Sequence, residues 1–306
     1  MREERVVEAR DERVGARAAA LGVRTLVSEL RGVLAGAGVE DARAEARDIV
    51  AAVAGAARLW PSLHPDAVVD EALAARARAA ARARAGGAPF AYAVGQTAFR
   101  HLTLTVDERV LIPRQETEVL VDAVLESVAG ITGGIAVDVG TGSGAIALAL
   151  ASEGRFGRVI GTDISRGALA VAAINVERCR GVLRAPVELR SGAYLEPLRG
   201  ERVRVVVSNP PYIAYDEAPL LPRGVRDWEP PAALFTAGGG MAATAAVIAG
   251  AAAVVEPGGL LALEVDSRRA SLAAELALGH GAWRDVRIVL DLAGRERILL
   301  ARRQDG

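Results

Sequence analysis

From residue 135 onward the sequence alternates short apolar runs with longer stretches of helical character. The apolar runs, each bounded by glycine, aspartate or asparagine, cover residues 135–139, 159–162, 203–207 and 260–265. Continuous apolar runs of this length, with helices between them, are typical of parallel strands that are buried on both faces of one sheet. Two further runs, at 286–290 and 298–300, predict a hairpin at the end of this sheet. The pattern therefore predicts an α/β fold.

The chain before this sheet is predicted to be helical. Leu26 and Leu30 recur at helical spacing, and residues 66–85 form a strong helix-forming stretch that ends before two glycines. Residues 99–106 then alternate apolar and polar side chains like a strand, and residues 110–114 are predicted to continue a hairpin. We expect three parts, which are a helical domain over 1–85, a linker with the hairpin over 86–112 and the sheet domain over 113–306.

The composition excludes several kinds of chemistry. All 37 basic residues are arginine, so the chain offers neither a Schiff-base lysine nor the lysine of a Walker-type phosphate loop. Three histidines lie far apart in the sequence and Cys179 is the single cysteine, which predicts no disulfide and no metal site. A formal net charge of −1 argues against broad affinity for nucleic acid.

The sequence also bears on location. The N-terminus is charged and lacks the apolar core of a signal peptide. The longest apolar run, residues 241–255, is shorter than the roughly 20 residues that a membrane span needs. We interpret this run as a buried helix and expect a cytoplasmic protein without membrane contact.

A glycine-rich run follows the first predicted strand of the sheet. Val137-Asp-Val-Gly-Thr-Gly-Ser-Gly leads into a helix predicted to start near Ser143, and Asp163 closes the next strand. Glycines let the backbone approach a ligand, and an acidic residue at the position of Asp163 can accept both ribose hydroxyls. Three interpretations remain open: S-adenosylmethionine, a nicotinamide or flavin dinucleotide, and a turn without a ligand. Asp138 favours the first, because the methionine end of S-adenosylmethionine carries an ammonium group.

A second motif follows the strand at 203–207. Ser208-Asn-Pro-Pro-Tyr lies at the same edge of the sheet as the glycine run, where ligands of α/β proteins bind. The carbonyl oxygens of Asn209 and Pro210 can both face one planar NH₂ group, and Tyr212 can stack on that plane. Two such acceptors stabilise the positive charge that develops on the nitrogen during attack. Transfer from a sulfonium needs in-line positioning more than a strong base, so the motif predicts methylation of a planar nitrogen.

Several runs together carry a resemblance to a known family. They are Leu111-Ile-Pro-Arg-Gln-Glu-Thr-Glu, the loop from Asp138 to Gly144, Thr162-Asp-Ile-Ser, Val207-Ser-Asn-Pro-Pro-Tyr-Ile, Asp227-Trp-Glu-Pro-Pro-Ala-Ala-Leu and Asp291-Leu-Ala-Gly-Arg-Glu-Arg. From about Gly86 to Arg303 the chain resembles the bacterial peptide chain release factor glutamine N(5)-methyltransferases. The resemblance implies a Rossmann-like class I methyltransferase sheet with a small helical N-terminal domain for the substrate.

The resemblance also implies roles for single residues. The S-adenosylmethionine site would consist of Asp138, Gly140, Thr141, Gly142, Ser143, Gly144, Asp163, Tyr194 and Asn209, with Asp163 on the ribose and Tyr194 on the adenine. The glutamine side chain would lie among Asn209, Pro210, Pro211 and Tyr212, and the catalytic residues would be Asn209, Pro210 and Tyr212. No metal is implied.

The implied substrate is the glutamine of a Gly-Gly-Gln motif in class I peptide chain release factors. We expect the chain to bind that protein as a monomer, without direct contact to nucleic acid. The motifs leave open the glutamine of another protein, such as a ribosomal protein, and adenine-N(6) methylation, because adenine also presents a planar NH₂ group. A dinucleotide-dependent oxidoreductase and a non-catalytic binding module are further alternatives.

Some positions depart from the family pattern. Ala193 stands where an acidic residue usually precedes the adenine-stacking residue, and Asp266 and Arg269 replace a glycine and a glutamine. These departures bear on cofactor affinity and substrate fit. The proline-containing segment 213–234 is interpreted as a lid over the glutamine pocket, which Arg114 and Glu116 are predicted to orient.

Overall fold

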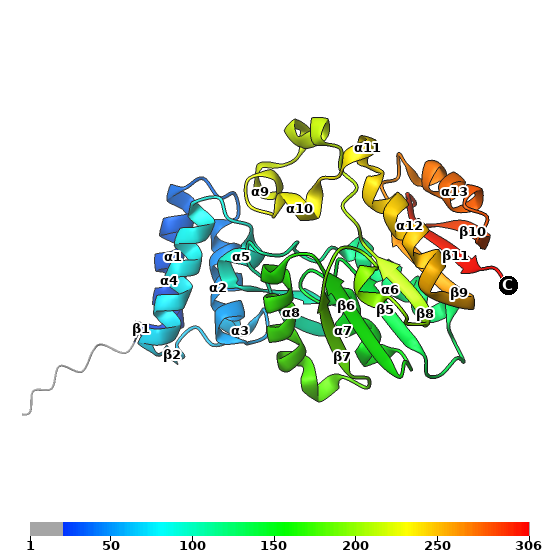
Figure 1. Ribbon diagram of the computed structural model, residues 1–306. Coiled ribbons are helices and arrows are strands. Elements are labelled where there is room, and N and C mark those ends of the chain that lie inside the picture. Colours follow the sequence, from blue (N-terminus) through cyan, green and yellow to red (C-terminus); the bar gives the residue numbers. More distant parts are fainter. Residues whose placement is uncertain (1–20, 306) are drawn as a thin grey trace, which may run out of the picture. The chain divides into compact units, whose positions relative to one another are not determined.

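The computed structural model describes residues 21–305 (Figure 1). Contacts divide the chain into two compact units, one that ends at Gly87 and one that begins at Ala88. Among the described residues, no helix combines the length and the apolar character that crossing a membrane requires.

The N-terminal unit is mainly helical. It consists of α1 (Val23–Gly36), α2 (Ala42–Ala54), α3 (Trp60–Leu63), α4 (Glu71–Ala85) and the short antiparallel pair β1 (Leu21–Gly22) and β2 (Val68–Val69). Leu26 and Leu30 of α1 are completely buried, as their helical spacing predicts. The helix predicted from residue 66 begins only at Glu71. Residues 68 and 69 pair with β1, and the Asp70 carboxylate caps α4 by accepting a hydrogen bond from the N–H of Leu73 (2.7 Å).

The second unit is built on one seven-stranded sheet with the order β10-β11-β9-β8-β5-β6-β7. The strands are β5 (Ile135–Val139), β6 (Arg158–Asp163), β7 (Val187–Ser191), β8 (Val203–Ser208), β9 (Val255–Glu264), β10 (Trp283–Leu290) and β11 (Glu296–Arg303). The strands from β5 to β9 pair in parallel, and β11 runs antiparallel to both of its neighbours. The predicted parallel sheet and its terminal hairpin are thus present.

One strand of the seven-stranded sheet was not predicted. β7 lies at the end of the sheet, and its polar residues Glu188 and Arg190 interrupt the apolar pattern. Arg190 forms ion pairs with Glu188 and Glu201, both at 2.8 Å. An end strand with one free edge needs no continuous apolar run, so periodicity alone does not reveal it.

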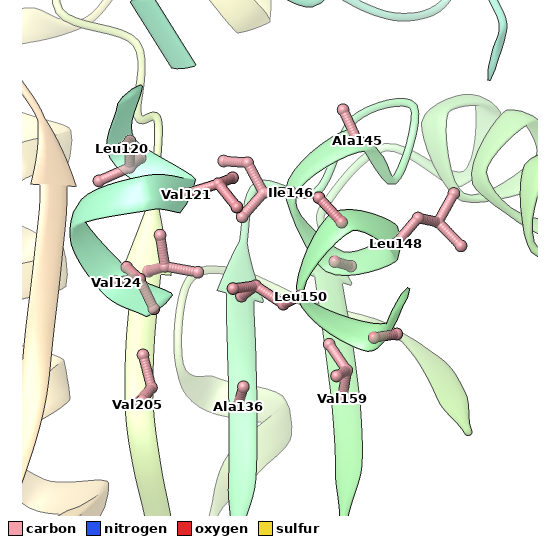
Figure 2. Close-up of a cluster of buried hydrophobic side chains, with 14 of the residues drawn as sticks. Leu120, Val121, Val124, Ala136, Ala145, Ile146, Leu148, Leu150, Val159 and Val205 are labelled. Atoms are coloured by element: carbon pink, nitrogen blue, oxygen red, sulfur yellow. The ribbon is translucent and has the colours of Figure 1, made fainter. Parts of the chain in front are cut away.

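Helices cover both faces of the sheet. One face is covered by α6 (Gln115–Ser127), α7 (Ala145–Glu153) and α8 (Arg166–Cys179), the other by α12 (Ala242–Val254) and α13 (Ala270–Gly279). Figure 2 shows side chains of α6 and α7 that point toward the strands of the first face. The neighbouring residues Ala136 and Val137 belong to the clusters on opposite faces, as alternation along a strand requires.

The segment before the sheet contains α5 (Phe90–Val94) and the hairpin of β3 (Gln96–Phe99) and β4 (Leu102–Thr105). A single strand over residues 99–106 is therefore wrong, because the chain turns at Arg100 with a positive φ of 54°. Residues 110–114 do not continue the hairpin; they form an irregular segment that leads into α6. The hairpin is complete with two strands of four residues each.

The chain makes one long excursion between β8 and α12. The lid segment, residues 213–234, contains η3 (Tyr215–Leu220), α9 (Arg223–Arg226) and α10 (Pro231–Leu234), and α11 (Ala237–Gly240) follows it. Two further short helices are η1 (Arg180–Val182) and η2 (Glu196–Leu198). The N–H of Ile213 donates to the carbonyl oxygen of Leu234 (3.1 Å), so the two ends of the lid segment meet. Its repeated prolines favour such short pieces over one long helix.

Candidate active site

The order of the strands places two loops side by side. From β5 the chain proceeds to β6 and β7 on one side of the sheet, and later to β8 and β9 on the other. The carboxyl ends of β5 and β8 are therefore neighbours, which is where open α/β sheets bind ligands. A cavity opens at this edge, and seven predicted site residues line it: Gly140, Gly142, Asp163, Tyr194, Asn209, Pro210 and Pro211.

The other predicted site residues lie outside the lining. They are Asp138, Thr141, Ser143, Gly144 and Tyr212. Asp138 is buried at the end of β5, and the side chains of Thr141 and Ser143, within the glycine loop, are buried as well. The structure thus separates residues that face the cavity from residues that support them.

The glycine loop, residues 140–144, has a backbone that other residues adopt with difficulty. Gly140 and Gly142 have φ angles of +72° and +54°, in the left-handed region. The N–H groups of Gly140 and Thr141 both donate to the carbonyl oxygen of Thr162, at 2.8 and 2.9 Å. These bonds fix the loop against the end of β6, while its glycines leave the cavity side free of side chains.

Asp163 holds the same loop from the cavity side. Its Oδ2 accepts a hydrogen bond from the N–H of Gly142 (2.9 Å), and its Oδ1 accepts one from the N–H of Ser165 (2.8 Å). Burial raises the pKa of this carboxyl group, and the backbone donors oppose the rise. Each carboxylate oxygen keeps a further lone pair that can face a ligand.

Asp138 supports the loop from below. Its Oδ2 accepts hydrogen bonds from the Thr141 hydroxyl (2.7 Å) and from the N–H of Ala147 (3.1 Å) in α7. Its Oδ1 is buried without a hydrogen-bond partner. Burial, opposed by these two donors, raises the pKa of Asp138 to about 7. Asp138 therefore ties the end of β5 to the start of α7.

The far end of the cavity is apolar. Ala193 and Tyr194 follow β7 and line the cavity together with Ile164, which is 71% exposed. Tyr194 has a positive φ of 47°, and its carbonyl oxygen accepts a hydrogen bond from the Thr162 hydroxyl (3.0 Å). The aromatic ring is thus carried on a fixed, strained turn beside the cavity. Ala193 contributes only a methyl group at the position where the family pattern has an acidic residue.

Asn209 directly follows β8. The nitrogen of its side-chain amide has a hydrogen-bond partner, and the oxygen has none. Its Nδ2 donates to the Thr117 hydroxyl oxygen (3.1 Å), whereas its Oδ1 is buried without a partner. A buried polar atom without a partner costs free energy unless a ligand satisfies it. The carbonyl of Asn209 is therefore available to accept a hydrogen bond at this cavity.

The sequence did not predict a role at the site for Thr117 or Glu264, which are linked to Asn209 by a chain of hydrogen bonds. Thr117, at the start of α6, donates to Glu264 Oε2 (2.7 Å), and the Tyr212 hydroxyl donates to Glu264 Oε1 (3.3 Å). Burial raises the pKa of Glu264, while Thr117, Arg297 and Tyr212 oppose the rise. One signal was available in the sequence: Glu264 ends the strand after β8, and the carboxyl ends of neighbouring parallel strands meet at one edge.

The lid segment is attached by a buried ion pair. Arg114 Nη2 lies 2.5 Å from Glu229 Oε1, and the Glu229 side chain is only 1% exposed. Burial raises the pKa of Glu229, and the Arg114 charge opposes this rise. Pro230, Ala232 and Ala233, next along the lid segment, line the cavity. Arg114 therefore contacts the lid segment directly, through a carboxylate that the surrounding protein covers.

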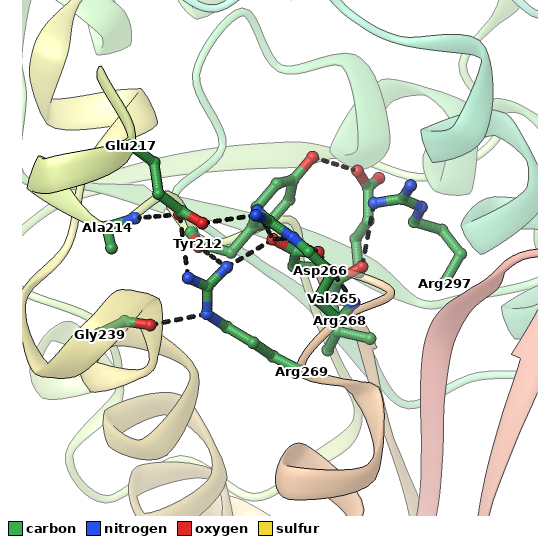
Figure 3. A network of polar contacts seen from close by, with 10 residues as sticks. Tyr212, Ala214, Glu217, Gly239, Val265, Asp266, Arg268, Arg269 and Arg297 are labelled. Carbon is green, nitrogen blue, oxygen red and sulfur yellow. Dashed lines mark hydrogen bonds and ion pairs between the residues drawn. The ribbon is translucent and has the colours of Figure 1, made fainter. Parts of the chain in front are cut away.

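A second polar network holds the other end of the lid segment (Figure 3). The Arg269 guanidinium lies between Asp266 (2.5 Å) and Glu217 (2.9 Å), and it donates to the carbonyl oxygen of Gly239 (2.6 Å). Arg268 also pairs with Glu217 (2.6 Å) and Asp266 (2.5 Å). Two of the departures from the family pattern, Asp266 and Arg269, are thus partners of each other and anchor the lid segment to the end of β9.

Several groups that line the cavity can contact a ligand. The glycine loop and Asp163 offer backbone and carboxylate groups, and Asn209, whose Oδ1 is buried without a partner, lines the same cavity. Cys179 is buried in α8 and does not line the cavity. Within residues 21–305, no three His, Cys, Asp or Glu side chains are grouped so that they could bind a metal ion.

Comparison with known proteins agrees with this geometry. Residues 25–95 match the family described as "PrmC N-terminal domain", and residues 115–219 match "Methyltransferase small domain". The release factor glutamine methyltransferase of Moorella thermoacetica is 40% identical over 272 residues, which cover 89% of this chain and 95% of that protein. The protein of the same name from Rhodopirellula baltica is 35% identical over 86% of this chain and 90% of its own length. The chain belongs to the release factor glutamine methyltransferase family.

A solved structure supports the fold of this release factor glutamine methyltransferase family member. A crystal structure described as a methyltransferase from Pyrococcus furiosus aligns with a TM-score of 0.52 and 17% identity, over 68% of this chain and 92% of that chain. At this identity the likeness concerns the fold alone. The predicted family and the Rossmann-like methyltransferase sheet are both confirmed.

Proposed function

We propose that this chain transfers a methyl group from S-adenosylmethionine to the side-chain amide nitrogen of the glutamine in the Gly-Gly-Gln motif of class I peptide chain release factors. The observation that carries the proposal is the free carbonyl of Asn209, which is buried at the same cavity as the glycine loop. Family membership supports the reaction and the kind of substrate.

The cavity residues fit S-adenosylmethionine. Positive φ angles at Gly140 and Gly142 leave a backbone cradle without side chains, and Asp163 offers lone pairs to a ribose. Tyr194 presents an exposed ring at the apolar end, where it can face an adenine. When bound, S-adenosylmethionine supplies a methyl group that is activated by a sulfonium. Asp138 supports the cradle through Thr141 and does not itself line the cavity.

The chain's own groups act mainly on the acceptor nitrogen. Asn209 Oδ1 and the carbonyl oxygen of Pro210 would accept the two N–H bonds of the glutamine amide and hold its nitrogen toward the donor. As the nitrogen gains positive charge, these preorganised oxygens bind it more strongly than they bind the neutral amide. Tyr212 remains a proposed residue of the glutamine pocket. An N-methylated amide that still carries its extra proton is very acidic, so the proton can leave to water without a strong base.

The release factor is the proposed partner, bound by one copy of this chain in the cytoplasm without direct contact to nucleic acid or membrane. We propose that residues 1–85 form the substrate-binding domain, that 86–112 link it to the rest, and that 113–306 carry the transfer. The match of residues 25–95 to a family-specific N-terminal domain supports a dedicated role for this part. Residues 1–20, at its start, lie outside the described residues.

Mass spectrometry of the reaction products tests the proposal. A class I release factor and a DNA duplex are each incubated with the chain and with S-adenosylmethionine that carries an isotopically labelled methyl group. We expect one labelled methyl group on the peptide that contains Gly-Gly-Gln and none on the DNA. Label on adenine, or on a different glutamine only, would refute the assignment.

A further inference from the structure

The two orientations of the Asn209 amide are not equivalent for the proposed function. An amide side chain rotated by 180° exchanges its oxygen and nitrogen, and only the oxygen can accept an N–H bond from a substrate amide. In the structure, Nδ2 donates to the Thr117 hydroxyl oxygen (3.1 Å) and Oδ1 is free. The orientation that serves the transfer is thus the one that Thr117 selects.

The Thr117 hydroxyl selects it because its single proton is already used. That proton points to Glu264 Oε2 at 2.7 Å, so the side of the oxygen toward Asn209 presents a lone pair. A lone pair attracts the NH₂ end of the amide and repels the carbonyl end. Thr117 and Glu264 are 4% and 1% exposed, so water does not compete for these bonds.

Glu264 determines the direction of both bonds. Glu264 receives a hydrogen bond on each of its two oxygens, and because Thr117 donates one of them, its hydroxyl oxygen can only accept from Asn209. Glu264 is itself fixed, because it ends β9 beside β8 and its Oε1 accepts from the Tyr212 hydroxyl at 3.3 Å. Three separate elements, α6, the turn after β8 and β9, therefore converge on one oriented chain of hydrogen bonds.

We propose that Thr117 and Glu264 form a relay that holds the Asn209 carbonyl toward the substrate nitrogen, and that both are positioning residues for methyl transfer. The proposal deepens the proposed function and rests on it for its catalytic meaning. The relay should have little effect on the affinity for S-adenosylmethionine, since neither Thr117 nor Glu264 lines the cavity. Its effect therefore lies in the rate of transfer.

Two substitutions of Thr117 distinguish the effect of its hydroxyl group from the effect of its packing. Thr117→Val keeps the shape and removes the hydroxyl, whereas Thr117→Ser keeps the hydroxyl. We expect T117V to lower kcat on the release factor by about 10- to 100-fold. KM for S-adenosylmethionine should change little, and T117S should retain most of the activity. Equal losses in both variants, or wild-type kcat in T117V, would overturn the relay.

A double-mutant cycle tests whether the relay acts through Asn209. In a chain that already carries Asn209→Ala, the relay has nothing left to orient, so adding T117V should cause no further loss of rate. A further loss as large as the one in the wild-type background would mean that Thr117 acts by another route. That result would overturn the proposal even if T117V alone were slow.

A spectroscopic measurement tests the relay without any substrate. The sequence contains only two asparagines, Asn175 and Asn209, so selective ¹⁵N labelling gives two side-chain amide groups. Asn175 serves as an internal control, because its Nδ2 donates to the carbonyl oxygens of Thr105 and Ser143, both at 2.9 Å. We expect T117V and Glu264→Gln to shift the Asn209 signals and to leave those of Asn175 in place.

The two kinds of measurement can fail separately. Asn209 signals that do not respond to T117V and E264Q would overturn the relay, whatever the substrate is. If the signals respond as expected but the wild-type chain does not methylate the release factor, the proposed function is refuted and the relay stands as a property of Asn209.

Discussion

Three carboxyl groups at or near the cavity accept hydrogen bonds from the chain itself; Asp138 and Glu264 are buried, and Asp163 is half-buried. Asp138 and Asp163 accept hydrogen bonds from the glycine loop, and Glu264 accepts them from Thr117 and Tyr212. Burial raises the pKa of all three groups, while their donors counteract the rise. At the scale of the residue, the site is therefore built from acids whose state of charge responds to pH closer to neutrality than ordinary carboxyl groups do.

Asp138 makes the stability of the fold depend on pH. Its pKa in the folded chain is about 7, above the ordinary 3.8, so the folded state holds a proton that the unfolded state has lost. This contribution to the free energy of unfolding is complete below pH 4. It disappears as the pH rises to about 7, and it amounts to on the order of 4 kcal/mol.

Denaturant unfolding at pH 5 and pH 8 checks this expectation. Asp138→Asn keeps one oxygen for Thr141 and Ala147 and carries no charge, so the variant should lose less stability between the two pH values than the wild type does. Parallel losses in the two proteins would show that Asp138 is not the group responsible.

At the scale of the element, the contacts of the lid segment could not be predicted from the sequence pattern. The sequence predicts a proline-containing lid over residues 213–234, and the structure shows that this segment consists of short helices and that its two ends meet. The partner of Arg114 could not be read from the sequence, because Glu229 is far along the chain and only the fold brings the two together. For the same reason Asp266 and Arg269 looked like separate departures, although they form one ion pair.

The Arg114–Glu229 pair should control the opening of the lid segment. Removing Arg114, whose side chain is 33% exposed, leaves a carboxylate that is 1% exposed without its cation, so the cost should lie below the roughly 3 to 5 kcal/mol of breaking a fully buried pair. We expect Arg114→Ala to accelerate backbone hydrogen exchange in residues 213–234.

Arg226→Ala provides a matched control within the same segment. Arg226 pairs with Asp227 at 2.8 Å, but both side chains are more than one third exposed. Exposed pairs contribute about 0 to 1 kcal/mol, so this variant should exchange like the wild type. If R226A and R114A accelerated exchange equally, the buried pair would not be the anchor.

At the scale of the whole molecule, the sequence predicted the architecture better than it predicted the contacts. The apolar runs identified β5, β6, β8 and β9, and the two motifs pointed to the same edge of the sheet. β7 was not predicted, because its polar residues interrupt the apolar run expected of a buried strand. The relay was not predicted, because Thr117 and Glu264 are 147 residues apart and a local sequence pattern cannot indicate a hydrogen bond between residues so distant in the chain. What depends on periodicity was predictable, and what depends on tertiary contact was not.

The most direct test of the account is the rate of a single turnover in Asn209→Ala. In the proposed mechanism the free carbonyl of Asn209 accepts a hydrogen bond from the acceptor amide, so its removal should lower the transfer rate by about 10²- to 10³-fold. Affinity for S-adenosylmethionine, measured by calorimetry, should remain within a few fold, since Asp163 and the glycine loop are unchanged. A transfer rate close to that of the wild type, in a variant that is folded, would contradict the central claim.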